Sequence, residues 1–475
     1  MRVVVVGGGL AGVAAALELV RRGAEPVVVE AAPGATALSW GTLDVAPAVP
    51  GSRRLRWRTP LRDAPLTGAD RLAILVGAYA AHPYAALWRR PEGHVPAGGP
   101  DAGAPAEQVK RAAADLAAAL APHGLSLEGS LDENRLLADL HGSLRVADFA
   151  FTGPASGCLA EAAEIAWVAV RGLPGAPPPV ALRRLAAERA ALGLAPVPLR
   201  ALELRLPEGL PVESTARLAA ALERPEAAAA FREAARTLAS EPPAAGRVWL
   251  FPPVLGLDSV ALQLAALREC LAGRVAETLG ALPDATAGFR LQRALAAALD
   301  AAGVVRHRAR ATGVETRDGR AAGVLLAPAS APGDRQASAP GDAPGPPARL
   351  AADAVVLATG RFLSGGLRDG PRGVAESLLG LPLFDAQGER VDGRPARASV
   401  RRRWLDLQPL FSAGVVVDGR LRPLSAPDGA PVLSNLFAAG DLLGGFDPAR
   451  ERTGLGVALQ SGVTAARHAA SGVAP

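Results

Sequence analysis

The sequence predicts an α/β fold in which the N- and C-terminal segments together build a parallel sheet, with a mixed α+β domain inserted between them. Apolar runs that end in small-residue turns occur at the start of the chain, at 3–12, and again in its last third, at 353–360 and 436–441. Such runs are typical of buried parallel strands that lead into crossover helices. The middle of the chain instead mixes helical runs, short strand-like stretches and proline-containing loops. The expected division is 1–65 and 286–475 for the two parts of the first domain, and 66–285 for the inserted domain.

A glycine-rich turn follows the first apolar run. Four valines at 3–6 form the expected strand, and Gly7, Gly9 and Gly12 then give the pattern G-x-G-x-x-G. The first glycine allows the tight turn, the second lets the backbone approach a pyrophosphate, and the third lets the next helix pack closely on the strand. The phosphates would lie at the positive N-terminus of that helix.

A second strand and an acidic residue support this interpretation. Valines at 27–29 run into Glu30, which lies 18 residues after Gly12. A carboxylate at this place can accept hydrogen bonds from an adenosine ribose. Strand, turn, helix, strand and acid all fall in register, so a dinucleotide site is favoured over a βαβ unit with chance glycines.

The apolar stretch at 3–20 also resembles a signal peptide or a membrane span. The glycine turn and Glu18 interrupt it, and Arg21 and Arg22 follow. No other uninterrupted apolar stretch approaches the ~18 residues that a membrane helix needs. We therefore expect no transmembrane segment.

The middle of the chain carries several further expected elements. The loop at 32–44 is rich in small and hydroxylated residues, which suits approach to a phosphate or a ring; an ordinary surface loop is the alternative. Residues 328–348 repeat Ala-Pro-Gly-Asp and predict a flexible insertion in a hairpin loop. The other expectations are helices at 66–125 broken by a tip at 91–105, strand-like stretches at 125–150, helical runs at 160–240, a strand at 247–251, helices at 258–271 and 291–302, and strands at 304–307, 312–317 and 322–327.

The last third of the chain carries two more strand ends and a helix start. The strand within 353–360 ends at Thr359-Gly360, and the strand within 436–441 ends at Asp441. Residues 453–459 begin the last helix with glycines, which again is a site for an anion or a carbonyl group. These sites lie hundreds of residues apart, so we expect them to converge at one edge of the sheet on a long, two-ended ligand.

Composition excludes several classes of protein. The 51 basic residues face 46 acidic ones, and Lys110 is the only lysine, so the pI of about 10.1 reflects arginine usage and not a large positive excess. Basic residues are scattered apart from Arg401, Arg402 and Arg403, and we expect no nucleic-acid partner. The two cysteines, Cys158 and Cys270, indicate a reducing compartment and no metal site or iron–sulfur cluster in this chain.

These motifs together resemble the two-domain flavoproteins of the succinate dehydrogenase and glutathione reductase type. The resemblance implies a Rossmann-like FAD-binding domain, with Asp441 on the ribityl chain and the last helix directed at the flavin pyrimidine. The resemblance and the motifs give these expected cofactor contacts: Gly7, Gly9, Leu10, Ala11, Gly12, Glu30, Ala37, Leu38, Ser39, Gly41, Thr42, Leu43, Ala358, Thr359, Gly360, Gly440, Asp441, Gly454, Leu455, Gly456 and Val457.

A closer resemblance is to the family of B-type subunits of anaerobic glycerol-3-phosphate dehydrogenase. It rests on Ala-Leu-Ser-Trp-Gly-Thr-Leu-Asp at 37–44, Gly-Gly-Phe-Asp-Pro at 444–448, and the segments 251–257 and 283–295. It implies oxidation of glycerol 3-phosphate to dihydroxyacetone phosphate, with electrons passed to quinone. The implied partners are a homologous catalytic flavoprotein and an iron–sulfur subunit that docks at the membrane. The implied location is cytoplasmic, at the inner face of the membrane through those partners.

The flavin and the catalytic role leave alternatives open. The resemblance implies FMN in the B-type subunit, whereas the dinucleotide motif predicts FAD, which we adopt with FMN as the alternative. No catalytic base is identified: His141 fits a structural turn better than a substrate contact, and Arg450 and Arg452 fit a solvated loop or a partner surface better than the flavin edge. A stand-alone FAD oxidoreductase of another substrate and a non-catalytic electron-relay or scaffold subunit are the alternative functions.

Overall fold

The computed structural model describes residues 1–46, 66–88, 104–175, 177–240, 245–280, 284–328, 348–403, 406 and 408–471. Its contacts divide the chain into two compact units. Most of the expected tip at 91–105, the interior of the expected insertion at 328–348, and Pro283 lie outside the described residues. Unit 1 comprises Met1–Ala35, Ala73–Ala112 and Ala296–Pro475, and unit 2 comprises Thr36–Leu72 and Ala113–Leu295. The expected domain boundaries, 1–65, 66–285 and 286–475, differ from this division and remain a prediction.

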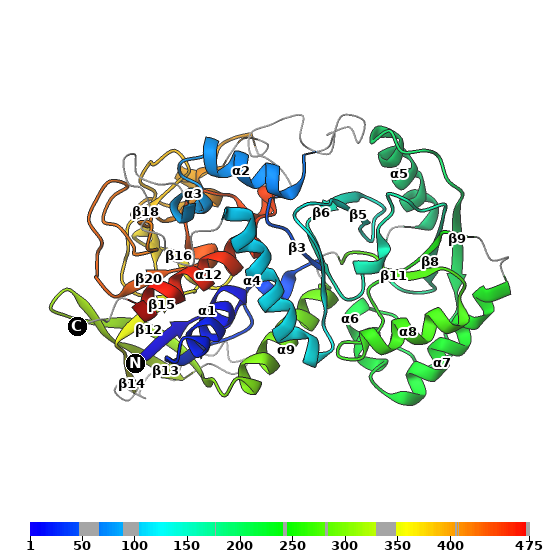
Figure 1. Cartoon of the computed structure of the whole chain (residues 1–475), viewed down its shortest axis with the longest axis horizontal. Coiled ribbons are helices and arrows are strands. Elements are labelled where there is room, and N and C mark those ends of the chain that lie inside the picture. The colour runs from blue at the N-terminus through cyan, green and yellow to red at the C-terminus, as the bar shows by residue number, and fades with distance from the viewer. Residues whose placement is uncertain are drawn as a thin grey trace. The chain divides into compact units, whose positions relative to one another are not determined.

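The core of unit 1 is a seven-stranded sheet (Figure 1). Its order is β14-β13-β12-β2-β1-β15-β20, and the five strands from β12 to β20 are parallel neighbours. The valines of β1 and β2 are almost fully buried, as expected for the middle of a parallel sheet. The predicted parallel sheet built from both ends of the chain is therefore confirmed. Its strands are β1 Arg2–Val6, β2 Glu25–Glu30, β12 Val305–Arg317, β13 Arg320–Pro328, β14 Ala348–Ala351, β15 Ala354–Leu357 and β20 Leu436–Ala438.

Two helices from opposite ends of the chain pack together in unit 1. They are α1, Leu10–Arg21, and α12, Gly454–Ser471, shown in blue and red in Figure 1. A Cβ atom at Gly462 of α12 would overlap the carbonyl oxygen of Ala11 in α1, so a glycine at this position lets the two helices approach closely. The C-terminal helix thus helps to cover the first βαβ unit.

The hairpin beside the parallel strands differs from the expectation in one respect. The strands expected separately at 304–307 and 312–317 form the single strand β12. Its first residues pair with β2 and its later ones, from Ala309, pair antiparallel with β13, with register irregularities after Ala311 and Glu315. Strands β13 and β14, which flank the expected insertion, are antiparallel neighbours.

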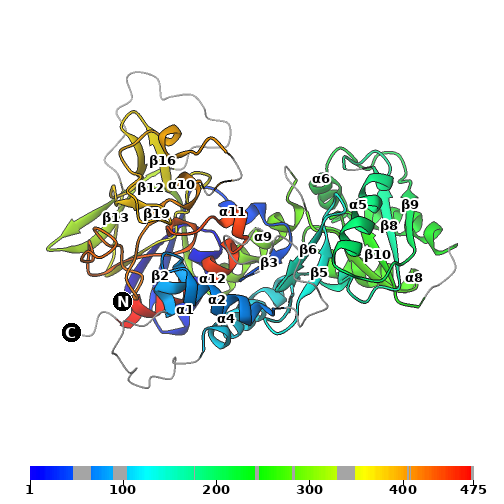
Figure 2. The same cartoon turned by 90° about the horizontal axis from the view of Figure 1, so that it is seen from above.

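Unit 2 contains a second parallel sheet, of four strands in the order β11-β10-β8-β9 (Figure 2). Two of these, β8 Glu164–Val170 and β9 Leu199–Leu204, lie where only helical runs were expected, and that expectation was wrong. A short apolar run such as β8 has no periodicity that separates a buried strand from a buried helix. The other two are β10 Arg247–Phe251 and β11 Arg274–Glu277.

Both faces of the four-stranded sheet are covered. Trp249 and Phe251 of β10 pack into a core with Phe231, while Val248 and Leu250 pack into a second core with Trp167. Alternate residues of one strand therefore serve opposite faces, which explains why 247–251 is apolar almost throughout. The helices of unit 2 include α5 Pro178–Ala191, α6 Thr215–Ala221, α7 Pro225–Arg236 and α8 Val260–Cys270.

The remaining described elements are shorter or cross from one unit to the other along the chain. They are α2 Gly68–Ala78, α3 Pro83–Trp88, α4 Pro105–Leu120, α9 Thr286–Ala301, α10 Pro409–Ser412, α11 Pro448–Glu451, β3 Thr42–Leu43, β4 Leu127–Gly129, β5 Arg135–Ala138, β6 Leu144–Ala147, β7 Phe149–Phe151, β16 Leu367–Gly370, β17 Gly373–Glu376, β18 Leu383–Phe384 and β19 Gly414–Val415.

A buried ion pair lies at the carboxyl end of β11 in unit 2. The guanidinium of Arg290 on α9 donates to both carboxylate oxygens of Glu277, and its Nε donates to the carbonyl oxygen of Gly256 at 2.7 Å. The Leu255 amide donates to Glu277 Oε1 at 2.7 Å. Both charged side chains are almost fully buried, so each depends on the other for the loss of its hydration.

Removing one partner of this pair is expected to destabilise the protein. Arg290→Met leaves the Glu277 carboxylate buried without its cation, and we expect the free energy of unfolding to fall by about 3–5 kcal/mol in urea titrations. The double variant Arg290→Met with Glu277→Gln removes the charge as well and should recover part of the loss. Arg293 lies on the same helix as Arg290 and forms an exposed pair with Asp258. Arg293→Ala breaks this pair and should lower the free energy of unfolding by less than about 1 kcal/mol. An equal loss in the Arg293 variant would contradict the assignment.

Candidate flavin-binding site

The three strand ends predicted to converge lie side by side in unit 1. Val6 of β1 is the register partner of Leu357 in β15, which is the register partner of Ala438 in β20. Because these strands are parallel neighbours, the turns that follow them lie level at one edge of the sheet. This is the edge at which parallel α/β sheets bind their ligands.

The turn after β1 depends on its glycines. Gly7 has φ +127°, and a Cβ atom there would overlap the carbonyl oxygen of Ala358 in the neighbouring turn. A Cβ atom at Gly12 would overlap the carbonyl oxygen of Gly7. Gly9 precedes α1 without a side-chain cap, so the turn presents backbone at the helix N-terminus. The first and third glycines thus have the close-packing roles that the motif predicts.

Glu30 lies beside this turn and carries an interaction that the sequence did not reveal. Its Oε1 accepts hydrogen bonds from Arg306 Nη2 at 2.7 Å and Nε at 3.1 Å. A Cβ atom at Gly8 would overlap Oε2 of the same carboxylate. The ion pair fixes the carboxylate against the turn, and a carboxylate can accept further hydrogen bonds from ribose hydroxyls.

The turn after β15 brings a hydroxyl group to the same edge. The Oγ1 atom of Thr359 is buried without a hydrogen-bond partner among the described residues. Gly360 has φ +68°, and the loop then returns so that Ser364 Oγ lies 3.4 Å from the Ala35 amide nitrogen. The loops after β2 and β15 therefore meet beside the glycine turn.

Arg361 is a candidate site residue that the sequence analysis did not single out. Its buried guanidinium donates to the carbonyl oxygens of Asp441 and Leu443 at 2.7 Å, to that of Phe446 at 2.9 Å, and to that of Phe411. Burial lowers the pKa of this arginine. A lone arginine directly after a small-residue strand end was the available signal. Arg361 clamps the loop after β20 onto the turn after β15.

Asp441 lies in the clamped loop, as the flavin assignment requires. Its Oδ1 is buried without a hydrogen-bond partner among the described residues and lies 3.6 Å from Arg361 Nε. Burial raises the pKa of Asp441, the arginine acts against that shift, and Asp447 adds to it. Such a carboxylate lacks a strong donor, and a ribityl hydroxyl would supply one.

The start of α12 completes this set of groups. Gly454, Leu455, Gly456 and Val457 form its first turn, and the Gly440 amide near Asp441 donates to Ser461 Oγ of the helix at 2.8 Å. Thr453 is fully buried just before the helix, and its Oγ1 has no hydrogen-bond partner among the described residues. Three buried polar atoms therefore lack a hydrogen-bond partner among the described residues. They belong to Thr359 and Asp441, in the turns at this sheet edge, and to Thr453, directly before α12. The residues present fit a polar, hydroxyl-bearing cofactor such as FAD.

A buried histidine supports the segment before α12. The Tyr84 amide donates to His82 Nδ1 at 3.1 Å, and His82 Nε2 lies 3.3 Å from Glu451 Oε2. The Asp447 amide donates to Glu451 Oε1 at 2.9 Å. This contact connects α11 to the residue that precedes α3 within unit 1, and it is a second feature that sequence reasoning missed.

The expected cofactor contacts at 37–43 belong to unit 2, whereas the other expected contacts belong to unit 1. Gly41 has φ +111°, and its carbonyl oxygen accepts from the Phe151 amide where β3 pairs with β7. In the same unit, the Arg145 guanidinium lies 3.7 Å from the centre of the Trp40 ring. The roles of Ala37, Leu38, Ser39, Gly41, Thr42 and Leu43 toward a flavin remain a prediction.

The candidate catalytic side chains take ordinary positions. His141 is exposed in a turn that Asp139 stabilises by accepting from the amides of His141 and Ser143. Arg450 is exposed on α11, and Arg452 follows with φ +60°. Among the described ranges, no cluster of histidine, cysteine or carboxylate side chains is suited to a metal ion, and no helix there could span a membrane.

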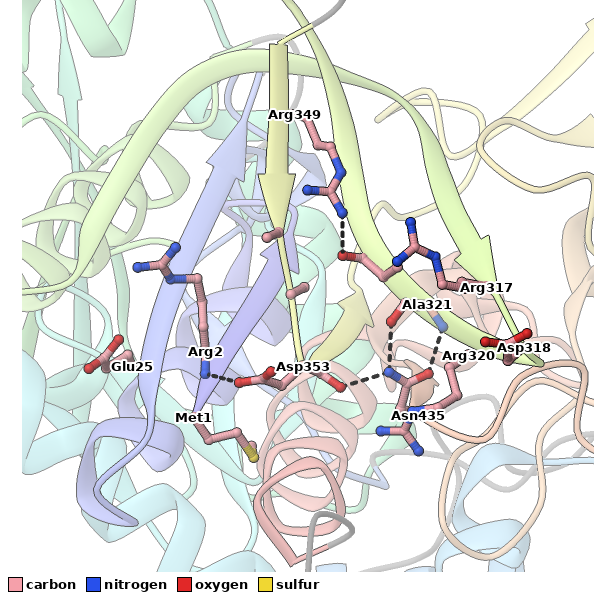
Figure 3. Close-up of a pocket in the computed structure, with 13 residues that line it drawn as sticks. Met1, Arg2, Glu25, Arg317, Asp318, Arg320, Ala321, Arg349, Asp353 and Asn435 are labelled. Carbon is pink, nitrogen blue, oxygen red and sulfur yellow. Dashed lines mark hydrogen bonds between the residues drawn. The ribbon is translucent and has the colours of Figure 1, made fainter.

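A separate hollow lies at the opposite edge of the sheet, where β1 and β15 begin (Figure 3). It has a volume of about 650 Å³. Asn435 closes one side by bonding Ala321 and the carbonyl oxygen of Asp353, whose carboxylate accepts from the Arg2 amide. Both signs of charge line this hollow, so it lacks the uniform charge of an anion site.

Comparison with known proteins supports the flavin assignment. Residues 2–85 match the family model described as an FAD binding domain. The chain is 28% identical over 489 residues to the B-type subunit of anaerobic glycerol-3-phosphate dehydrogenase from Yersinia pseudotuberculosis, covering 99% of this chain and 98% of that protein. The chain is thus similar to these B-type subunits over nearly its whole length. A probable B-type subunit from Halobacterium salinarum is 33% identical over 229 residues, 47% of each chain.

Solved structures show only weak likeness to the whole chain. Sdh1 of Mycobacterium smegmatis aligns at 14% identity and a TM-score of 0.38, over 99% of this chain and 68% of that one. A flavocytochrome c3 fumarate reductase aligns at 10% identity and a TM-score of 0.40, over 100% and 78%. Likeness at this level does not bear on the chemistry. The sequence similarity and the family model confirm the resemblance and support FAD as the cofactor.

The glycine turn provides a test of the binding edge. Gly12→Ala places a methyl group on the Gly7 carbonyl oxygen, and displacement of the turn should weaken FAD binding about 5- to 150-fold, the equivalent of ~1–3 kcal/mol of overpacking. The ratio of flavin absorbance to protein absorbance after gel filtration measures how much FAD each variant retains. Gly77→Ala, on a helix where a Cβ meets open space, is the matched control and should retain FAD.

Asp441 provides a second test, independent of backbone packing. Asp441→Ala removes the buried acceptor and should weaken FAD binding about 10- to 150-fold, since a hydrogen bond to a charged group contributes ~1.5–3 kcal/mol. Titration of the apo-chain with FAD, followed by fluorescence quenching, measures the dissociation constant. Asp441→Asn keeps an acceptor oxygen and should recover part of the affinity. An unchanged dissociation constant in the alanine variant would remove Asp441 from the site.

Proposed function

We propose that this chain is the flavin-bearing B-type subunit of an anaerobic glycerol-3-phosphate dehydrogenase. In this role it takes part in the oxidation of glycerol 3-phosphate to dihydroxyacetone phosphate, and electrons pass to quinone through partner subunits. The observation that carries the proposal is the similarity to B-type subunits over 99% of the chain. The partners would be a homologous catalytic flavoprotein and an iron–sulfur subunit that docks at the inner face of the membrane.

The residues at the sheet edge would share the cofactor's parts among them. The turn from Gly7 to Gly12 would hold the diphosphate, with Glu30 at the adenosine ribose. Asp441 would accept from the ribityl chain, and Ala358, Thr359 and Gly360 would line the space between. The first turn of α12, from Gly454 to Val457, would direct backbone N–H groups at the pyrimidine. When bound, FAD supplies the two-electron acceptor for the alcohol.

The protein's own contribution to that chemistry is mainly electrostatic and positional. Arg361 holds the loop with Asp441 in place, so the loop is ordered before the cofactor binds. The N-terminus of α12 favours negative charge, and a reduced flavin carries such charge on its pyrimidine side. The buried contact between His82 and Glu451 helps to hold the segment before that helix in place.

A second candidate, an electron-relay subunit without its own substrate site, is favoured by one observation. The histidines that the structure describes in unit 1 are unsuited to act as the base for the alcohol. His82 is almost fully buried and its Nδ1 accepts from the Tyr84 amide, His307 lies on β12, and His468 lies in the last helix, where burial lowers its pKa. None of these three described histidines is therefore assigned to accept the hydroxyl proton.

Anaerobic reduction of the flavin separates these functions. We expect glycerol 3-phosphate to bleach the flavin absorbance of the purified holo-chain, and glycerol, which lacks the phosphate, to leave it oxidised at the same concentration. Bleaching only after the partner subunits are added would favour the relay. Bleaching by a different alcohol but not by glycerol 3-phosphate would favour a stand-alone oxidoreductase and would refute the proposed substrate.

A further inference from the structure

One surface segment of unit 1 concentrates exposed arginines. Within 394–403 the sequence reads Arg-Pro-Ala-Arg-Ala-Ser-Val-Arg-Arg-Arg, with no acidic residue. All five arginine side chains are exposed. Among the described residues, no carboxylate lies within ion-pair distance of any of them. The five are Arg394, Arg397, Arg401, Arg402 and Arg403, and they are called the arginine segment below.

Some exposed arginines elsewhere in the chain are paired with carboxylates. In unit 2, Arg205 bonds Glu203 at 2.9 Å, and Arg217 bonds Glu213 at 2.6 Å. Directly before the arginine segment, Arg390 takes up Asp392 at 2.9 Å, so this carboxylate is already engaged. Other exposed arginines, such as Arg308 and Arg310 on β12, have no ion pair among the described residues, so the segment is distinguished by having five such side chains within ten residues.

The charge of the segment equals the charge of the whole protein. With 51 basic and 46 acidic residues the formal net charge is +5, and the arginine segment carries five positive charges. The rest of the chain thus has equal numbers of basic and acidic residues, while these five charges lie within ten residues. A concentrated charge of this kind attracts anions far more strongly than the same charge spread over the surface.

The backbone of the segment is held in place. The Arg401 amide donates to Gln408 Oε1 at 2.6 Å, and Gln408 Nε2 donates to the Arg403 carbonyl oxygen at 2.8 Å. Gln408 itself is buried at the start of α10. The protein therefore fixes this turn while leaving the guanidinium groups in solvent.

Two exposed apolar side chains accompany the charges. Val400, within the segment, is 48% exposed, and Phe411 on α10 is 51% exposed. Gln408 links the turn at 401–403 to α10, and the Phe411 amide donates to the Gln408 carbonyl oxygen. The surface thus combines guanidinium groups with an aliphatic and an aromatic side chain.

We propose that the arginine segment, with Val400 and Phe411, is a docking surface for anionic phospholipid. Guanidinium groups bind phosphate oxygens through two parallel hydrogen bonds, and clustered basic residues are attracted to anionic leaflets. The boundary between headgroups and acyl chains also accepts apolar side chains. A lipid surface therefore satisfies both kinds of side chain, whereas an acidic polymer satisfies only the charges. The contact is made by this chain directly and does not depend on its substrate.

Vesicle sedimentation tests the surface on the FAD-loaded full chain. Vesicles of equal parts phosphatidylglycerol and phosphatidylcholine should bind the chain, vesicles of phosphatidylcholine alone should not, and added salt should weaken binding. The triple variant Arg401→Gln, Arg402→Gln, Arg403→Gln should lower the partition coefficient on the order of 100-fold. Phe411→Ser should lower it less, by about tenfold.

A matched variant controls for net charge. Arg171→Gln, Arg205→Gln, Arg217→Gln removes three exposed charges in unit 2 and should leave vesicle binding within about twofold, if the effect is local. Retained flavin absorbance shows that each variant is folded. An equal loss in the matched variant, equal binding to neutral vesicles, or binding only to duplex DNA or polyglutamate would overturn the proposal.

Discussion

The site depends on the hydrogen-bonded register that holds β15 between β1 and β20. This register makes Val6, Leu357 and Ala438 level, so that turns separated by hundreds of residues in sequence emerge at one edge. A shift of any strand would move its turn along the sheet and separate the glycines from Asp441. The buried valines of β1 resist such a shift, because central strands of a parallel sheet are held on both sides and on both faces.

Two charged side chains are buried at this edge of the sheet, which is energetically unfavourable for both. Arg361 is buried and its pKa is lowered, while Asp441 beside it is buried and its pKa is raised, so burial opposes the charged state of each group. Four backbone carbonyls compensate the arginine, but the described protein groups do not fully compensate the carboxylate. An imbalance of this kind is tolerated when a ligand completes it, and a polyhydroxylated chain is suited to do so.

The parallel sheet could be predicted from the sequence, but the long-range contacts that hold the loops at its edge could not. The valine runs and the turn at Gly7 to Gly12 carry local signals, since a buried parallel strand and a tight turn each restrict composition. The pair of Glu30 with Arg306 and the clamp of Arg361 join residues far apart, and no local pattern encodes such partners. The strand β8 was missed because a short apolar run fits a buried helix as well as a strand. The arginines at 401–403 were visible in the sequence, but only the structure showed that the described carboxylates near them are engaged elsewhere or out of reach.

The position of β1 in the middle of its sheet has a consequence for biosynthesis. One neighbour, β2, is made within the first 30 residues, but the other, β15, begins at residue 354. A nascent chain therefore carries an apolar strand with one open edge until three quarters of the protein has left the ribosome. The residues 113–295 of unit 2 are made without interruption and contain their own parallel sheet, so they can fold meanwhile. During that interval the unpaired edge of β1 is open to pairing with another chain.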